Sequence, residues 1–425
     1  MELETMNCEF ANCSCGRAHR CSVEAVVIGA GALDSLRELC ASYDNILVVS
    51  DENTHRVCGE AVLHTLSNRH CRELVLTSRE KVVVPDEESI KTIENALDKE
   101  TALLVGVGSG VINDLCKYVS FFHGLPYYIV ATAPSMDGYA SVGAAMILNG
   151  MKVTVNARPP RAIIGDTAIL KNAPLEMLQA GYGDIIGKFS CLNDWKLSAL
   201  VQDEYFCQRI YDCTLACAEK LRPMADRILS RDEQAVDFLM EALVTVGVLM
   251  SYVNSSRPAS GSEHHMSHFF EITGILEGKD YFAHGVDVLL SSFYTQKIRE
   301  ELLTMDVPHA YTVVEGEMYM QKLREIYHIL AEEVASLQNK VGFYQKNRLE
   351  CYQSRWEKIK EVLREAPPSA EIERLIRRIG LNLADFEALY GREKIENALW
   401  FAKDLKDRYT VLWLYFDLKY QNKQD

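Results

Sequence analysis

Histidines are concentrated in one short stretch of the chain, RPASGSEHHMSH, which covers residues 257–268. Three of the 11 histidines lie there within five residues of one another, and His284 follows shortly afterwards. If the stretch is helical, His264 and His268 share one face because they are four residues apart, whereas His265 points elsewhere. Neutral imidazole is a common ligand of divalent transition metals. The pattern therefore indicates either a metal site that still needs a carboxylate or the solvated face of a helix.

A suitable carboxylate lies in the segment GYGDIIGK, residues 181–188. Its Asp184 and Lys188 are four residues apart on a predicted helix, so they face the same way. They could form an ordinary ion pair within that helix, which contributes a few tenths of a kcal/mol. Alternatively, Asp184 is the ligand that the histidines lack, and Lys188 attracts a phosphate or steadies Asp184.

A glycine-rich turn offers a place for phosphate groups. The sequence GVGSGVIND, residues 106–114, follows an apolar strand pattern and opens a helical one. Glycines let the backbone approach a pyrophosphate closely, and a helix N-terminus supplies N–H groups with positive potential. The pattern is GxGxG rather than the GxGxxG fingerprint, and it lacks the lysine of a P-loop. By itself it also fits a purely structural turn.

Polar side chains follow two other predicted strands. Asp51 comes after the strand at residues 45–50, where a carboxylate can accept hydrogen bonds from a ribose diol and would repel a 2′-phosphate. It therefore favours NAD over NADP, although it could instead cap a helix. Residues 132–141 (TAPSMDGYAS) bring hydroxyls and a carboxylate to the end of another strand. Ligands of parallel sheets bind at this end of the strands.

Short apolar runs alternate with helical patterns in the N-terminal half. Such runs indicate a parallel sheet that is covered on both faces. An antiparallel hairpin over residues 144–155 should turn at Asn149 and Gly150 in a type I′ turn. We predict strands at residues 24–28, 45–50, 73–77, 102–106, 126–131 and 162–165, and helices at 29–42, 55–67, 86–98 and 110–122.

Only helical patterns remain beyond about residue 174. The helix that carries the histidines should begin near Glu263, with Ser260 or Ser262 as its cap. Helices are expected at 203–221, 231–254, 263–273, 285–302, 317–337 and 348–364, with more beyond 370. We therefore predict an N-terminal cysteine-rich tail, a Rossmann-like α/β dinucleotide-binding domain and an all-α metal- and substrate-binding domain, at residues 1–22, 23–173 and 174–425.

The composition is that of an ordinary globular protein and narrows the range of partners. The chain has 425 residues, of which 48% are hydrophobic and 25% charged. Its net charge of −15 argues against a general nucleic-acid or anionic-membrane binder, but not against an anionic substrate held by local cations. We expect no apolar run long enough to span a bilayer, no signal peptide and a cytoplasmic location.

The chain contains 13 cysteines, most of them in apolar segments, as expected of buried thiols in a reducing compartment. The exception is the tail, where Cys8, Cys13, Cys15 and Cys21 surround His19. Their spacing matches no common zinc-finger pattern. A loose, reduced tail is therefore the favoured interpretation, and a small zinc site is the alternative.

Taken in order, the motifs GSGVIND, TAPSMDGYAS, GYGDIIGK, SRPASGSEHHMSH and HG resemble the metal-dependent alcohol dehydrogenase and dehydroquinate synthase superfamily. Within it, the chain is most similar to the sn-glycerol-1-phosphate dehydrogenases, over about residues 23–300. The motifs are specific jointly rather than singly, and the cysteine-rich tail is not part of the pattern. The resemblance implies a dehydroquinate synthase-like fold, NAD(H) or NADP(H), and one zinc, nickel or iron ion per subunit. We also expect a homodimer.

The resemblance also implies roles for individual residues. Asp184, His264 and His284 would hold the metal, and His268 together with Asp137 would act on the substrate. Asp51 would contact the adenosine ribose. The pyrophosphate would contact Gly108, Gly110, Val111, Ile112, Asn113 and Asp114, and the nicotinamide end would contact Thr132, Ala133, Pro134, Ser135 and Ser141.

The implied reaction is the NAD(P)H-dependent reduction of dihydroxyacetone phosphate to sn-glycerol 1-phosphate, with ether-type glycerophospholipids as the fate of the product. Lys188 and Arg257 are phosphate-binding candidates by position only, and Arg257 could equally bond loop carbonyls. A dehydrogenase of unphosphorylated polyols is the nearest alternative. A dehydroquinate synthase-like lyase would need more cations near the motifs, and a non-catalytic metal or nucleotide binder is a third class.

Overall fold

The computed structural model of the chain describes residues 3–78, 82–148, 151–312, 314 and 316–420. It contains two compact units: unit 1 comprises Met1–Ile185 and Glu219–Ser256, and unit 2 comprises Ile186–Ala218 and Arg257–Asp425. The sequence pattern placed the division at residues 173 and 174 and set the tail apart. The observed division differs because a later segment, which carries the apolar helix α12, packs within unit 1.

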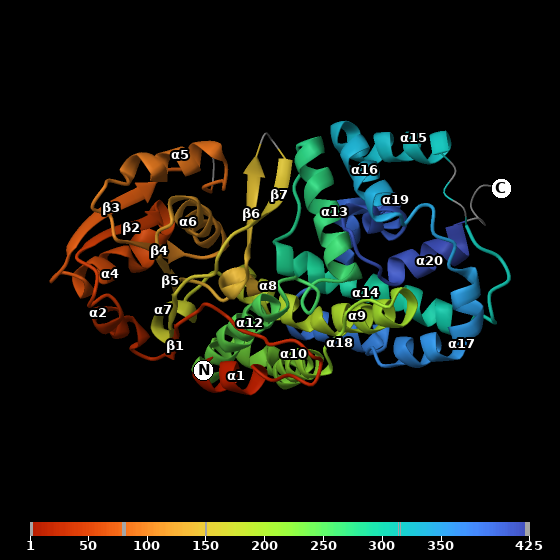
Figure 1. The fold of residues 1–425 in the computed structure, drawn as a ribbon, viewed down its shortest axis with the longest axis horizontal. Coiled ribbons are helices and arrows are strands. Elements are labelled where there is room, and N and C mark those ends of the chain that lie inside the picture. Colours follow the sequence, from red (N-terminus) through yellow and green to blue (C-terminus); the bar gives the residue numbers. More distant parts are fainter. Residues whose placement is uncertain (1–2, 79–81, 149–150, 313, 315, 421–425) are drawn as a thin grey trace. The chain divides into compact units, whose positions relative to one another are not determined.

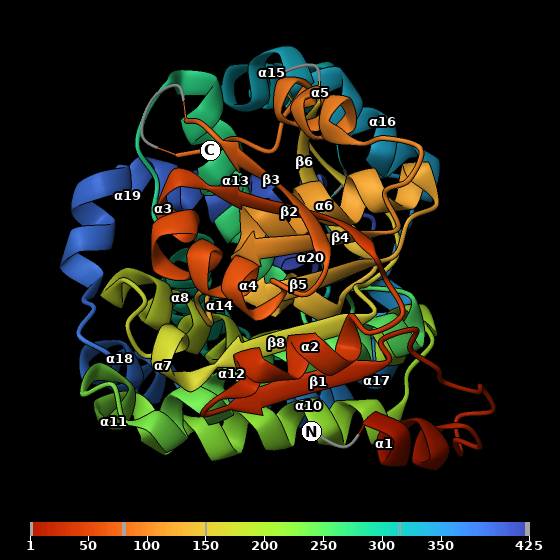
Figure 2. The same ribbon diagram turned by 90° about the vertical axis from the view of Figure 1, so that its left-hand side faces the viewer.

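Unit 1 is built on a six-stranded parallel sheet with the strand order β1-β8-β5-β4-β2-β3 (Figure 2). The strands follow the predicted apolar runs closely, which confirms the Rossmann-like α/β class. In the register, Gly108 pairs with Ala131 and Ser50 with Val107, so these strands end at one edge of the sheet. The strands are β1 (Ala25–Gly29), β2 (Asn45–Asp51), β3 (His70–Leu76), β4 (Leu103–Gly108), β5 (Tyr127–Ala131) and β8 (Ala162–Asp166).

Helices cover both faces of this sheet, which explains why the strands read as unbroken apolar runs. Val105 and Val107 of β4 pack in a core cluster with residues of α2 and α4. The intervening Gly106 faces α6, where a Cβ would meet Cys116 Sγ at 3.0 Å. The helices of unit 1 are α1 (Leu3–Phe10), α2 (Leu36–Leu39), α3 (Glu52–Thr54), α4 (Glu60–Thr65), α5 (Glu87–Ala96), α6 (Gly110–His123), α7 (Thr167–Leu170), α8 (Leu175–Ile186), α11 (Ala225–Leu229) and α12 (Glu233–Val253).

The predicted hairpin is present as the antiparallel pair β6 (Gly143–Leu148) and β7 (Met151–Asn156). Its predicted type I′ turn at Asn149 and Gly150 lies outside the described residues. The strand predicted last in this domain, β8, lies inside the sheet between β1 and β5.

Unit 2 is helical throughout its described residues, as the loss of strand signals predicts (Figure 1). Within it, α13 packs against α14, and α14 also packs against α18. Its helices are α9 (Lys188–Gln202), most of α10 (Gln208–Leu221), α13 (Ser262–Glu277), α14 (His284–Leu303), α15 (Gly316–Tyr327), α16 (Ala331–Val341), α17 (Leu349–Arg364), α18 (Ser369–Arg378), α19 (Leu383–Phe401) and α20 (Val411–Lys419).

Helix α12 is an exception to the expectation that no apolar run could span a bilayer. Among the described helices it alone has the length and composition to cross a membrane. Its most apolar window is 67% buried, and it packs on β1 and on the turn Asp137–Ala140. Such burial is typical of a helix in the core of a globular protein.

Candidate functional site

The predicted histidine cluster forms in unit 2. His264 and His268 lie on α13, and His284 is the first residue of α14. The ring centroids of His264 and His284 are 5.1 Å apart, and those of His268 and His284 are 5.2 Å apart. Because α13 and α14 pack against each other, three imidazoles from two helices meet at one place.

The start of α13 differs from the prediction. Gly261 occupies the N-cap position, and no side chain caps the helix there. Neither Ser260 nor Ser262 therefore has the predicted role. Instead, Asp194 Oδ2 accepts a hydrogen bond from Ser262 N at 2.7 Å, and Glu263 Oε1 accepts one from Gly261 N at 2.9 Å. The serine cap was therefore wrong, because buried carboxylates satisfy the first N–H groups of this helix.

Each histidine of the predicted metal set has a partner on its Nδ1 atom. His264 Nδ1 lies 2.6 Å from Glu263 Oε1, and His284 Nδ1 lies 3.2 Å from Ser267 Oγ. If Nδ1 carries the proton in each bond, Nε2 carries the lone pair that a metal needs. Ligating histidines in metal sites are held in this way. The donor set therefore fits a divalent transition metal.

Glu263 is fully buried in unit 2 and was missed by sequence reasoning. Burial raises the pKa of its carboxyl, but the hydrogen bonds that it accepts from His264 and from backbone N–H groups help to hold that pKa below its ordinary value. Glu263 is thus a carboxylate at neutral pH. Its only sequence signal was its position one residue before His264.

In unit 1, two predicted residues are joined directly. Asp184, in the last turn of α8, is fully buried, and its Oδ2 accepts a hydrogen bond from the backbone N–H of Asp137 at 2.9 Å. Asp137 begins a 3₁₀ turn that ends at Ala140. The carboxylate predicted to bind metal is therefore oriented by the loop predicted to meet the substrate.

The glycine-rich turn and the following strand end are neighbours. Thr132 N donates to Gly108 O at 3.1 Å, and α6 begins at Gly110. Asn113 Nδ2 donates to Asp114 Oδ1, and Asp114 Oδ2 accepts from Ala145 N, both at 3.1 Å. Asp114 therefore ties the first turn of α6 to the β6–β7 hairpin. Val111 and Ile112 lie in the same first turn of α6.

The loop of residues 132–141 is held from within unit 1. Ala133 O accepts hydrogen bonds from Tyr139 Oη at 2.7 Å and from Ser135 N at 3.1 Å. A Cβ at Gly181 on α8 would lie 1.9 Å from Pro134 O, so only glycine permits this approach.

Lys117 is a second residue that sequence reasoning missed. It is fully buried on α6, and its Nζ donates to Gly138 O at 2.8 Å, to Gly143 O at 2.9 Å and to Ser141 Oγ at 3.4 Å. Burial lowers its pKa, and Asp114 partly offsets that effect. A lysine among apolar residues of a helix was the available signal.

Asp51 caps a helix. Its Oδ1 accepts hydrogen bonds from Asn53 N at 2.9 Å and Thr54 N at 2.8 Å. It also borders an open pocket of about 360 Å³, lined by Asp51, Glu52, Asn53, Arg56, Ser78, Val82 and Val83. The cap was the alternative considered for Asp51, and a nucleotide role at this pocket stays a prediction.

The two candidate phosphate-binding cations have structural contacts in unit 2. Lys188 Nζ donates to Ala259 O at 3.0 Å. Arg257 binds Glu204 in a bidentate pair at 2.7 and 2.8 Å and also donates to Tyr409 O at 2.6 Å. Arg257 thus has the carbonyl-bonding role that was its alternative.

Comparison with known proteins identifies relatives. A family model described as iron-containing alcohol dehydrogenase matches residues 27–174. The chain is 30% identical to a glycerol-1-phosphate dehydrogenase [NAD(P)+] from Bacillus licheniformis, over 94% of this chain and 90% of that one. It is 32% identical to the protein of the same name from Halalkalibacterium halodurans, over 69% and 76% of the two chains.

A solved structure supports the fold alone. The crystal structure of a probable glycerol dehydrogenase from Sinorhizobium meliloti superposes with a TM-score of 0.53 at 19% identity, and the match covers 84% of this chain and 96% of that one. The sequence similarity to the two glycerol-1-phosphate dehydrogenases supports more than the fold, because it extends over most of the length of both of them. The chain therefore belongs to the glycerol-1-phosphate dehydrogenase family, among the iron-containing alcohol dehydrogenases.

Proposed function

We propose that this protein catalyses the NAD(P)H-dependent, metal-dependent reduction of dihydroxyacetone phosphate to sn-glycerol 1-phosphate, and the reverse oxidation. The observation that carries the proposal is family membership over most of the chain, together with metal-type donors at the motifs that define the resemblance. A nucleotide cofactor and a metal ion follow from the family; zinc, nickel and iron suit these donors equally.

Asp184, His264 and His284 are the proposed ligands of the ion. The contacts of His264 Nδ1 with Glu263 and of His284 Nδ1 with Ser267 support the tautomer that places the lone pair on Nε2. When bound, the ion polarises a ketone oxygen as a Lewis acid, and NAD(P)H supplies the hydride.

His268 is the proposed proton donor, acting at Nε2 directly or through water and Asp137. Its Nδ1 lies 3.8 Å from Glu271 Oε2, one turn further along α13, so a carboxylate lies beside the ring that must donate. Asp137, oriented by Asp184, is proposed to bind substrate or water beside it.

The dinucleotide is proposed to lie along the carboxyl edge of the sheet in unit 1. The N-terminus of α6, at residues 110–114, suits the pyrophosphate. The loop of residues 132–141 suits the nicotinamide end, and Asp51 suits the adenosine ribose. For the substrate phosphate, Lys188 and Arg257 stay predictions.

The alternative is a dehydrogenase of unphosphorylated polyols. The contacts of Lys188 and Arg257 favour it, because both candidate phosphate-binding side chains bond groups of the protein. Steady-state kinetics with dihydroxyacetone and its phosphate decide between the two. We expect kcat/KM to be at least about 100-fold higher for dihydroxyacetone phosphate than for dihydroxyacetone, because one or two charge-assisted bonds to the phosphate group contribute about that much. Equal or better use of dihydroxyacetone would favour the alternative. A cytoplasmic location, a homodimer and a lipid-forming fate of the product remain predictions.

A further inference from the structure

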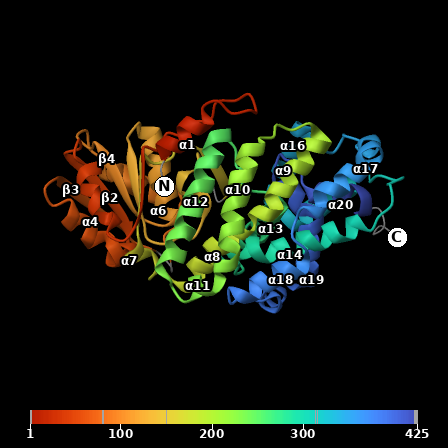
Figure 3. The ribbon, with the colours of Figure 1, turned by 90° about the horizontal axis from the view of Figure 1, so that it is seen from below.

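The N-terminal tail is folded rather than loose. Helix α1 lies beside one end of α12 (Figure 3), where the Phe10 and Tyr252 rings pack with centroids 5.1 Å apart. Tyr252 Oη donates to Asn7 Oδ1 at 2.9 Å, and His19 N donates to Phe10 O at 3.2 Å. The expected loose tail was therefore wrong, because aromatic packing on α12 fixes it.

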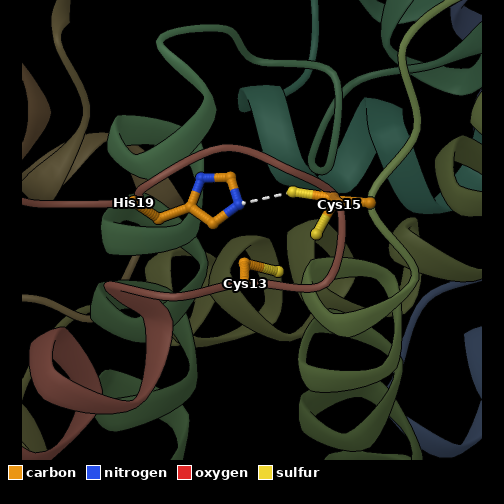
Figure 4. Close-up of side chains that lie close together, drawn as sticks. Cys13, Cys15 and His19 are labelled. Atoms are coloured by element: carbon orange, nitrogen blue, oxygen red, sulfur yellow. Dashed lines mark hydrogen bonds between the residues drawn. The ribbon is translucent and has the colours of Figure 1, made fainter.

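The fold of the tail brings three metal-type side chains together (Figure 4). One ligand atom each of Cys13, Cys15 and His19 lie within 4.8 Å of one another. Cys15 Sγ lies 3.2 Å from His19 Nε2. A turn closed by Gly16 N donating to Cys13 O at 3.1 Å makes this possible, and Gly16 has the left-handed φ of 82° that favours glycine. The side chain of Cys8 lies outside those described.

His19 is prepared as a ligand. It is fully buried, and Cys13 is 7% exposed. His19 Nδ1 lies 3.0 Å from the carbonyl oxygen of Tyr252, which can only accept a hydrogen bond, so Nδ1 carries the proton. Nε2 then presents its lone pair towards Cys15. A carbonyl partner on the far ring nitrogen is the usual outer contact of a metal-binding histidine.

We propose that Cys13, Cys15 and His19 bind a zinc ion that fastens the tail to α12, separate from the dehydrogenase centre. Two thiolates and one imidazole suit zinc better than magnesium or calcium. Binding converts each thiol to a thiolate and releases its proton to solvent, so no oxidant is needed. Water or another donor of the chain completes the tetrahedron. The role is structural, because the tail lies outside the motifs of the reaction.

Cobalt substitution of the full-length reduced protein distinguishes this site from the other. Thiolate ligands give Co²⁺ charge-transfer absorption in the near ultraviolet, whereas the proposed Asp184, His264 and His284 set has no sulfur. Wild type should show this absorption and bind a second metal equivalent. The variants Cys13→Ser and Cys15→Ser should lose both yet keep dihydroxyacetone phosphate turnover.

Matched variants complete the test. Cys21→Ser removes a tail thiol outside the cluster and should keep the absorption, as should His264→Ala. Should a tail variant misfold, limited proteolysis of wild type provides a second readout. Chelation should expose residues 1–22 to protease, and added zinc should protect them. Absence of the absorption in wild type, its persistence in the Cys13→Ser and Cys15→Ser double variant, or proteolysis that ignores zinc would each overturn the proposal.

Discussion

Asp184 and Asp137 are joined by a hydrogen bond of 2.9 Å from the backbone N–H of Asp137 to Asp184 Oδ2. The bond couples α8 to the loop that follows β5. Both elements belong to unit 1, and Gly181 lets them approach, since its missing Cβ would collide with Pro134 O at 1.9 Å. A proposed metal ligand and the proposed nicotinamide loop are therefore positioned by one contact region.

Gly181→Ala should disturb that region. The added methyl group must push α8 or the loop aside, at about 1–3 kcal/mol of stability. We expect the KM for NADH to rise at least about tenfold, because displacement of the loop removes cofactor contacts. Gly316→Ala is the control, since nothing lies within 4 Å of a Cβ at that position. An unchanged KM in Gly181→Ala would show that the loop does not hold the cofactor.

Glu263→Gln tests how His264 is positioned. The amide keeps the size of the side chain but loses the charge that fixes the His264 ring through a 2.6 Å contact. Metal affinity should fall about 10- to 100-fold, and excess metal should restore most of kcat. The measurement is metal titration monitored by turnover. Glu277→Gln, a carboxylate at the far end of α13, should leave the affinity unchanged. A kcat that stays low at saturating metal would mean that Glu263 has a role beyond positioning.

Asp51→Asn separates the two roles considered for Asp51. Asparagine still accepts hydrogen bonds from Asn53 N and Thr54 N, so the cap and the melting temperature should be retained. Loss of the negative charge, with Arg56 lining the same pocket, should raise the ratio of NADPH to NADH use several-fold. Asp51→Ala should change the ratio similarly but cost about 1 kcal/mol of stability. If neither variant shifts the ratio, Asp51 is not at the ribose.

Lys117→Met should alter both stability and its pH dependence. Loss of the charge-assisted bonds to Gly138 O and Gly143 O should cost about 1–3 kcal/mol. Burial holds the pKa of Lys117 below 10.5, so the unfolded chain binds more protons between the folded pKa and 10.5. Wild-type stability therefore gains from this residue as pH rises through that window.

Urea unfolding at several pH values below and up to 10.5 measures this contribution. The difference in unfolding free energy between wild type and Lys117→Met should grow with pH. Lys91→Met, on the exposed face of α5, serves as the control. A difference that stays flat across the window would contradict the assigned pKa direction.

Sequence reasoning located the local elements and failed on long-range contacts. Strand β4 and the helix α6 after it were predictable because apolar runs and a glycine turn are local signals. The approach of His264 to His284 depends on the packing of α13 on α14, which spacing could only suggest. The contacts of Lys117, of Asp194 with the start of α13, and of Tyr252 with the tail join residues distant in sequence. No local periodicity records such contacts, so only coordinates reveal them.

The stereochemistry of the product tests the central claim most directly. The metal-loaded protein should oxidise NADH in the presence of dihydroxyacetone phosphate, and chiral analysis should find sn-glycerol 1-phosphate. His264→Ala should lose metal and at least about 100-fold of this activity together, whereas the exposed His309→Ala should lose neither. Formation of sn-glycerol 3-phosphate, or full activity without metal, would contradict the account.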